Sequence, residues 1–392
     1  MFEIVDEKRD GAVIKVIGVG GCGGNAVRHM MEKGVEGVEF IVANTDAQAL
    51  DRNPAPKRIS LGAQLTQGLG AGAKPDVGRD AAMESKAALQ EAIQGADMLF
   101  ITAGMGGGTG TGAAPVIAQM AREMGILVVA VVTKPFRFEM QKRERAAQAG
   151  IDELQKHVDS LIVVPNEKLI QVLGRNVKLQ AAFAASNDVL HGAVAGISEV
   201  IHKPGDVNRD FADVRTIMSE LGMAMMGTAT AVGEGRGKAA AMAAVKSPLL
   251  EDVDLQGARG VLLCITSSPD ITLDELCEIT ETVQEFIAPD ATMLWGQSFD
   301  STMGDEVRVT MIATGLGAKR KMVAVQGGIG AAPRMEISMQ RTGTDNLTVL
   351  TDAVPTTAGL EVSYDEPTIT RNPGRHAARS LEIPTFLRKQ AD

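Results

Sequence analysis

The residues best suited to chemistry form one glycine-rich stretch, Gly104 to Gly112. It lies between an apolar run at 98–103, which predicts a buried strand, and a segment at 113–123, which predicts a helix with Pro115 in its first turn. Glycine lets backbone N–H groups approach an oxyanion without a Cβ in the way, and the dipole of a helix N-terminus attracts negative charge. We therefore interpret the stretch as a phosphate site and not as a flexible linker. Its candidate ligands are Gly104, Gly106, Gly107, Gly108, Thr109, Gly110, Thr111 and Gly112.

Two further glycine-rich segments occur along the chain. The segment at 18–23 satisfies GxGxxG, a dinucleotide fingerprint, and a third glycine loop lies at 68–72. A parallel sheet would bring all three loops to one edge, and three such loops suit a triphosphate better than a pyrophosphate. No GxxxxGK[ST] sequence occurs, so backbone N–H groups, helix dipoles and Mg²⁺ must offset the phosphate charge. The candidate ligands here are Gly20, Gly21, Cys22, Gly23, Gly24, Asn25, Ala71 and Gly72.

A pair of carboxylates lies further along the chain, in the sequence NRDFAD at 208–213. Asp210 and Asp213 are three residues apart, so both can face one way from the start of a helix. Aspartate is also favoured as a helix N-cap and in the first helical turn. The residue pattern alone therefore leaves open whether this pair serves a reaction or only stabilises a helix.

These residues need a scaffold, and the order of the expected elements predicts one. Strands at 13–19, 38–43, 98–103, 126–133 and 160–164 alternate with helices at 26–33, 76–94, 113–123 and 138–157. Such alternation predicts an α/β fold with a mostly parallel sheet covered on both faces, here a nucleotide-binding domain at 11–176. An apolar pattern at 177–203 predicts a central helix that is buried nearly all round.

The remainder is expected to form a smaller α+β domain at 204–316. Its expected helices are at 214–226, 237–247 and 273–288, and its expected strands are at 224–232, 260–266, 292–298 and 307–313. We expect a flexible arm at 1–10 and a disordered linker at 317–380, where Gly, Thr and Pro are scattered without periodicity. The last residues, 381–392, carry large apolar side chains. They are either a partner-binding peptide or a segment that docks on the chain's own core.

Composition excludes several classes of protein. The chain has 392 residues and a formal net charge of −10, which argues against nonspecific binding to nucleic acid or to anionic membranes. Its three cysteines form no CxxC pair, so neither a disulfide framework nor a zinc site is expected. No apolar run is long enough to span a membrane, and the charged N-terminus is unlike a signal peptide. We therefore expect a cytoplasmic protein.

The sequence GGGTGTG at 106–112 is similar to the signature of the tubulin/FtsZ family, in the form found in bacterial division GTPases. The sequence NxDFAD at 208–213 also resembles a loop of that family, and 381–392 resembles its C-terminal peptide. The resemblance implies a tubulin-like fold and a GTPase that uses GTP, GDP and Mg²⁺, with no metal ligands from side chains. It further implies head-to-tail self-assembly into the mid-cell division ring, with membrane tethers such as FtsA and ZipA bound to 381–392.

The resemblance also implies roles for individual residues. The loop at 208–213 would enter the nucleotide site of the next subunit, where Asp210 and Asp213 would orient and polarise the attacking water and Asn208 would support the γ-phosphate region. The glycine loops would hold the phosphates, and the segment at 20–25 would also reach the base. Two positions depart from the family pattern, because Cys22 and Met140 stand where small residues, usually glycine, are expected.

Four more residues complete the implied site. Glu139 and Arg143 fall where the family contacts the ribose, Phe183 would stack on guanine, and Asn187 would hydrogen-bond the edge of the base. Phe183 and Asn187 are four residues apart, so they share one face of a helix. From the residues alone, Phe183 could instead belong to the core, and Glu139 and Arg143 could be a solvated pair on a helix.

Two other functions stay in view beside a polymerising GTPase. An NAD-dependent oxidoreductase is compatible with GxGxxG, but it would need a catalytic His or Lys, and the five histidines include no convincing candidate. A nucleotide-gated scaffold that does not hydrolyse its ligand is the third possibility, and the NxDFAD sequence argues against it.

Overall fold

The computed structural model describes residues 11–174, 176–203, 207, 209–220, 222–251 and 253–316. The expected arm at 1–10, the linker at 317–380, the peptide at 381–392 and Asn208 lie outside the described residues. The chain divides into two units, Met1–Met322 and Val323–Asp392, and everything described below belongs to the first.

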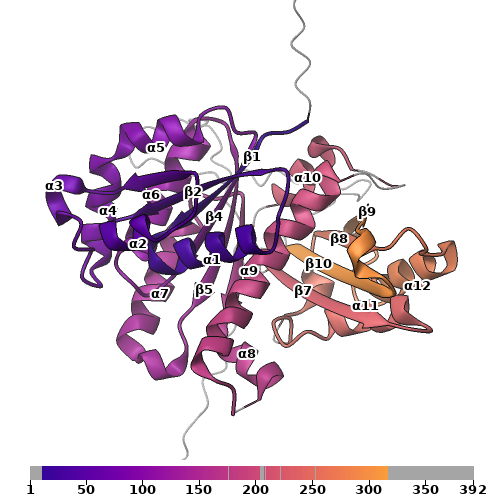
Figure 1. Ribbon diagram of the computed structural model, residues 1–392. Coiled ribbons are helices and arrows are strands. Elements are labelled where there is room, and N and C mark those ends of the chain that lie inside the picture. Colours follow the sequence, from indigo (N-terminus) through magenta and orange to yellow (C-terminus); the bar gives the residue numbers. More distant parts are fainter. Residues whose placement is uncertain are drawn as a thin grey trace, which may run out of the picture. The chain divides into compact units, whose positions relative to one another are not determined.

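One ten-stranded sheet, in the order β3-β2-β1-β4-β5-β6-β7-β10-β8-β9, runs through this unit (Figure 1). The first six strands pair in parallel, and β10 pairs antiparallel with both β7 and β8. The sheet is continuous because β6 and β7 pair briefly, through Leu161 with Met223 and Ile162 with Ala224. The strands are β1 Ile14–Val19, β2 Val38–Asn44, β3 Lys57–Ser60, β4 Met98–Gly104, β5 Leu127–Lys134, β6 Ser160–Pro165, β7 Met223–Val232, β8 Gly260–Ser267, β9 Thr292–Phe299 and β10 Glu306–Leu316.

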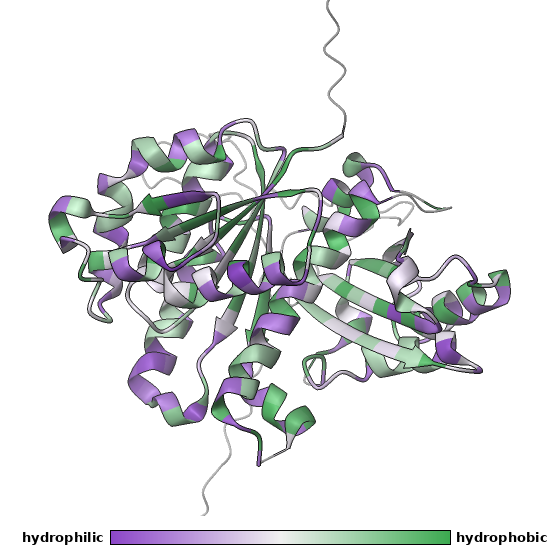
Figure 2. Ribbon diagram, in the orientation of Figure 1, coloured by the Kyte–Doolittle hydropathy of each residue, from purple (hydrophilic) through white to green (hydrophobic). Residues whose placement is uncertain are grey.

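Helices cover both faces of the sheet. One apolar core lies between the parallel strands and α4 to α7, and a second lies on the opposite face, beneath α1, α9 and α10. A third core packs α11 and α12 against β8 and β10. In Figure 2 the parallel strands β1 and β4 at the centre of the sheet are mainly green, the hydrophobic colour. The helices are α1 Gly20–Glu32, α2 Ala47–Asp51, α3 Ala63–Thr66, α4 Pro75–Glu84, α5 Lys86–Ile93, α6 Thr109–Glu123, α7 Gln141–Leu154, α8 Asn166–Leu173, α9 Leu179–His202, α10 Phe211–Met218, α11 Arg236–Val245 and α12 Leu273–Gln284.

Several expected boundaries are wrong. Some glycines were expected to lie in loops before two helices. They lie instead in the first turns of those helices, because α1 begins at Gly20 and α6 at Thr109. Pro115 consequently lies in the second turn of α6 and not in the first. The helix expected at 138–157 begins only at Gln141, and the one expected at 214–226 ends at Met218, after which the chain turns into β7.

The central helix α9 was expected to be buried nearly all round. In the structure this holds for only part of its length. Residues 193–198 are all buried between the two halves of the sheet. The first turns are not, since the side chains of Leu179 and Phe183 are 58% and 41% exposed. The edge strand β3 was not predicted from the sequence. It has one buried residue and no apolar run, because its other positions are exposed. None of the helices in the described ranges meets the length and apolarity that crossing a membrane requires.

Candidate nucleotide site

A cavity of about 300 Å³ lies where β1, β4 and β5 end and where α1 and α6 begin. Most of the residues expected to bind the nucleotide line it, together with others that the sequence did not single out. The expected residues in the lining are Gly20, Gly21, Cys22, Gly104, Gly107, Gly108, Thr109, Gly110, Glu139, Arg143 and Phe183. The additional ones are Val19, Met105, Thr133, Pro135 and Asn166.

Glycine is required in this lining because the starts of α1 and α6 lie against each other. Gly20 has a φ of +73°, and a Cβ built there would lie 3.0 Å from the Gly110 nitrogen. A Cβ at Gly104 would lie 2.6 Å from the Cβ of Cys22. Two helix N-termini therefore reach one cavity through bare backbone, which is the arrangement that binds phosphate groups.

Other expected ligands pack behind the cavity. A Cβ at Gly23 would lie 2.3 Å from the Thr102 oxygen, and one at Gly112 would lie 1.9 Å from the Pro75 oxygen. These two glycines hold α1 against the sheet and α6 against α4. Thr111 is buried, and its hydroxyl accepts a hydrogen bond from the Gly106 nitrogen, so it stabilises the loop from inside. Gly24, Asn25, Ala71 and Gly72 also lie outside the lining, although Ala71 packs against Gly108.

The Cys22 side chain lies inside the cavity wall. Its Sγ is 3.8 Å from the Thr133 hydroxyl. Burial raises the pKa of the thiol, and the nearby Glu139 carboxylate adds to the effect. Because the thiolate is the reactive form, this cysteine stays protonated and weakly nucleophilic at neutral pH.

Glu139 and Arg143 meet at one side of the cavity, but they do not share a helix. Glu139 ends the short 3-10 helix η1, Arg137–Glu139, and Arg143 lies in the first turn of α7. Their side chains nevertheless form an ion pair, and a Glu139 oxygen also accepts a hydrogen bond from the Phe136 nitrogen. Met140 joins the two helices with φ +74° and ψ 156°, a conformation that costs a residue other than glycine about 1–3 kcal/mol. This strain accounts physically for the preference for glycine at that position.

An aromatic group forms the far side of the cavity. Phe183 packs edge-on against Phe136, with ring centroids 5.4 Å apart. It is too exposed to count as a core residue, so a planar ligand could contact its free face. Asn166, the first residue of α8, is buried and accepts a hydrogen bond of 2.8 Å from Ser186. Asn187 is half-buried one turn after Phe183 and lies outside the lining.

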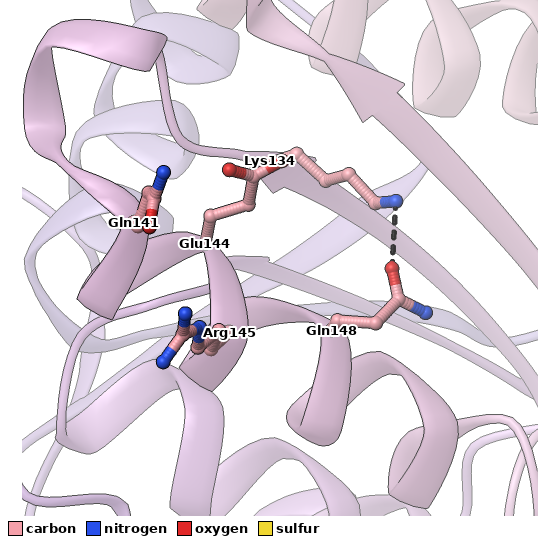
Figure 3. A pocket seen from close by; sticks show the side chains of 5 residues that line it. All are labelled: Lys134, Gln141, Glu144, Arg145 and Gln148. Carbon is pink, nitrogen blue, oxygen red and sulfur yellow. Dashed lines mark hydrogen bonds between the residues drawn. The ribbon is translucent and has the colours of Figure 1, made fainter. Parts of the chain in front are cut away.

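The cavity has little positive charge. Among the described residues that line it, Arg143 is the only cation. Lys134 follows Thr133 directly, but its ammonium group donates a hydrogen bond of 2.9 Å to Gln148 across a neighbouring hollow (Figure 3). Phosphate charge must therefore be offset mainly by backbone N–H groups and by the dipoles of α1 and α6.

The expected carboxylates are not part of this cavity. The N-terminal part of α9 carries Phe183 beside the cavity, whereas His202 at its other end contacts the Ala12 oxygen, before the start of β1. These two residues are about 28 Å apart along the helix axis. The carboxylates follow this far end, and α8 and α10 lie at opposite ends of α9 in Figure 1.

Local contacts hold the carboxylates in place. Asp210 is the N-cap of α10, and its side chain accepts a hydrogen bond of 2.8 Å from the Asp213 nitrogen. Asp213 forms an ion pair of 3.8 Å with Arg209, whose Nε donates to the Trp295 oxygen. The Asp213 side chain is 44% exposed, so it is available to another molecule.

Comparison with known proteins identifies the family. The model of the tubulin/FtsZ family GTPase domain matches residues 13–174, and that of the FtsZ family C-terminal domain matches 222–317. The chain is 51% identical to the cell division protein FtsZ of Pseudomonas aeruginosa over all of both chains. The chain belongs to the FtsZ family. It is accordingly a GTP-binding, GTP-hydrolysing cytoskeletal protein of cell division.

Further FtsZ relatives agree with this assignment. The cell division protein FtsZ of Coxiella burnetii is 49% identical over 99% of both chains. An empty FtsZ dimer of M. jannaschii is 44% identical, with a TM-score of 0.75 over 79% of this chain and 89% of that chain. The tubulin-like fold is thus confirmed. The matches do not support the oxidoreductase alternative, and a GTPase domain is inconsistent with a scaffold that does not hydrolyse GTP.

Proposed function

We propose that this FtsZ-family protein hydrolyses GTP only where a second copy completes the site. The nucleotide occupies the cavity of one subunit, and the next subunit supplies Asp210 and Asp213, together with Asn208 of the same sequence motif. The proposal is supported above all by the length of α9, which separates the cavity from these carboxylates within one chain. A single subunit therefore holds two half-sites at opposite ends.

Within the cavity, each group of residues would contact one part of GTP. The backbone at the starts of α1 and α6 binds the phosphates, and the 71–72 segment closes over them from beside Gly108. Glu139 and Arg143 contact the ribose, and Phe183 stacks on guanine with Asn187 near its edge. Asn166 is added to this set because its buried amide lies in the cavity wall beside Phe183. This assignment is supported by the glycines of the cavity lining, because side chains at these positions would fill the space for the phosphates.

Magnesium would be held by the nucleotide itself. No group of three or more potential side-chain ligands that could hold a metal occurs in the described part of the chain, and the one carboxylate of the lining, Glu139, is paired with Arg143. When bound to the phosphates, Mg²⁺ would neutralise charge that develops during phosphoryl transfer.

The chemical step would depend on positioning. Asp210 and Asp213 of the incoming subunit orient the attacking water and polarise it, while the backbone of α6 holds the phosphate that is transferred. Most of the catalysis of phosphoryl transfer comes from such positioning and from charge stabilisation. Arg209 would keep the Asp213 carboxylate correctly directed through their ion pair.

Assembly follows from the same geometry. A contact between the cavity end of one subunit and the carboxylate end of the next is heterologous and does not close on itself, so it propagates into a filament. Hydrolysis would weaken the contact and allow the filament to turn over.

The experiment that tests this proposal measures phosphate release from GTP with Mg²⁺ against protein concentration, with light scattering recorded alongside. We expect specific activity to rise steeply above a threshold concentration at which scattering also appears. Constant specific activity at all concentrations would contradict the shared site. The absence of turnover at any concentration would contradict GTP hydrolysis itself.

The last residues would connect the filament to the membrane. We propose a cytoplasmic protein at the mid-cell division site, with 381–392 bound by tethers such as FtsA and ZipA. The basis is the apolar and basic sequence of this segment, which lies outside the described residues.

Deleting 381–392 is expected to leave GTP turnover and filament formation unchanged and to abolish tether binding. The physical reason is that no residue described in the lining of the cavity and no described strand of the sheet belongs to this segment. A pull-down with purified tether checks the result, and a deletion of equal length within 330–370 serves as the control. Full retention of tether binding by the shortened chain would rule out this role.

A further inference from the structure

Three segments meet at one buried residue beside the cavity. Thr45 follows β2 and is completely buried. Its backbone oxygen accepts hydrogen bonds from the Gly70 nitrogen (3.0 Å) and from the Thr66 hydroxyl (3.3 Å). Its own hydroxyl lies 2.6 Å from that of Thr109, the first residue of α6. One residue thus ties the 66–70 segment to the phosphate-binding end of α6.

Burial determines the direction of the hydrogen bond between the two hydroxyl groups. Within the described part of the chain, the Thr45 hydroxyl contacts no other hydrogen-bond partner than Thr109. A buried donor that is left unsatisfied is unfavourable, so the Thr45 proton is donated to the Thr109 oxygen. The proton of Thr109 is then free to point into the cavity that Thr109 lines. Phosphate oxygens are acceptors, so a bound phosphate favours the same direction.

We propose that Thr45 is a positioning residue that fixes the Thr109 hydroxyl as a donor toward the phosphates of the nucleotide. The Thr45 hydroxyl orders the Thr109 proton, and the Thr45 carbonyl holds the 66–70 segment in register with it. The inference rests on the proposed nucleotide cavity, but it does not depend on completion of the site by a second subunit.

Nucleotide affinity of the unassembled chain tests the proposal. Binding of GTP and of GDP is measured by titration below the assembly threshold, for Thr45→Val and for Thr45→Ser. Valine keeps the shape of threonine and lacks the hydroxyl, so we expect binding about 3- to 10-fold weaker, the loss typical of one hydrogen bond. Serine keeps the hydroxyl and should bind within about twofold of the unmodified chain.

A matched control is available on β4. Thr102 is also completely buried, but its hydroxyl has no hydrogen-bond partner among the described residues. Thr102→Val therefore makes the same chemical change without removing a hydrogen bond, and it should leave nucleotide binding unchanged. Melting curves of all variants show whether they are folded at the assay temperature. If Thr45→Val is not folded, Thr45→Ala takes its place in the comparison with Thr45→Ser.

A double-mutant cycle with Thr109→Val separates this role from a merely structural one. If Thr45 acts through Thr109, adding Thr45→Val to Thr109→Val should weaken binding no further. Additive losses, or Thr45→Val binding as tightly as the unmodified chain, would overturn the inference. If Thr109→Val itself binds normally, the Thr109 hydroxyl is no donor to the phosphates and the inference is also overturned. If Gly107→Ala, which places a methyl group in the lining, binds GTP as tightly as the unmodified chain, the assignment of the cavity to the phosphates fails instead. The two proposals can therefore fail separately.

Discussion

Asp213→Ala is expected to bind GTP normally and to lose most of its GTP turnover, by about 100-fold or more. Asp213 lies in α10, which follows the end of α9 remote from the cavity, so its removal changes no contact to bound nucleotide in its own subunit. If it orients the attacking water in the neighbouring subunit, its loss affects only the chemical step. Titration with GTP and assays of phosphate release at concentrations above the assembly threshold check the two halves of this expectation.

Asp76→Ala provides the matched control. Asp76 also lies in the first turn of a helix and also pairs with a nearby arginine, Arg79, at 3.6 Å. Losing this exposed charge should cost about 0.3–1 kcal/mol of helix stability and leave turnover intact. Normal turnover by Asp213→Ala would eliminate the proposed role of that carboxylate. A loss of GTP binding would mean that Asp213 belongs to the nucleotide site of its own subunit, which contradicts the proposed division of the site.

Gly112→Ala is expected to destabilise the fold, although glycine to alanine normally favours a helix. Helix propensity would gain about 1 kcal/mol. Against this, the new Cβ would lie 1.9 Å from the Pro75 oxygen and 2.6 Å from the Arg79 nitrogen, both of them backbone atoms of α4. Moving two packed helices apart should cost about 3 kcal/mol or more, so the steric term outweighs propensity. The net loss is then about 2 kcal/mol or more, and a fall in melting temperature of about 3 °C or more is expected for a unit of this size.

Gly107→Ala separates folding from ligand binding. Among the residues that the structure describes, a Cβ at Gly107 would meet nothing within 4 Å, and Gly107 lines the cavity. This variant should melt like the unmodified chain and bind GTP more weakly, because the methyl group occupies space beside the phosphates. Equal melting temperatures for the two alanine variants would mean that α4 and α6 can separate at little cost, which contradicts the packing described here.

Much of the site could be predicted from local sequence. The glycine-rich stretch at 104–112 identifies itself, because few other residue types allow the backbone to approach a phosphate. Apolar runs also predicted the parallel strands, since strands buried on both faces have near-continuous hydrophobic sequences. Family resemblance supplied Glu139, Arg143 and Phe183, which line the cavity. The NxDFAD sequence was recognised as a unit, but its distance from the cavity could not be derived from it.

Only the tertiary structure decided which glycines face the ligand and which face another helix. Gly107 and Gly112 belong to one motif, yet the first lines the cavity and the second packs against α4. The same applies to threonine, since Thr109 faces the cavity whereas Thr111 bonds to the loop from inside. Long-range packing also overrides propensity at the start of α1, where glycines lie in helical turns.

Residues without a local signal were missed for the same physical reason. Asn166 and Thr45 look like ordinary polar residues after strands, and their positions matter only because strands distant in sequence pair side by side. The separation of the carboxylates from the cavity likewise depends on the length and direction of α9 between the two halves of the sheet. A local sequence pattern indicates which backbone conformation and which degree of burial a segment favours. Distances between segments are determined only when the sheet forms and the helices pack on it.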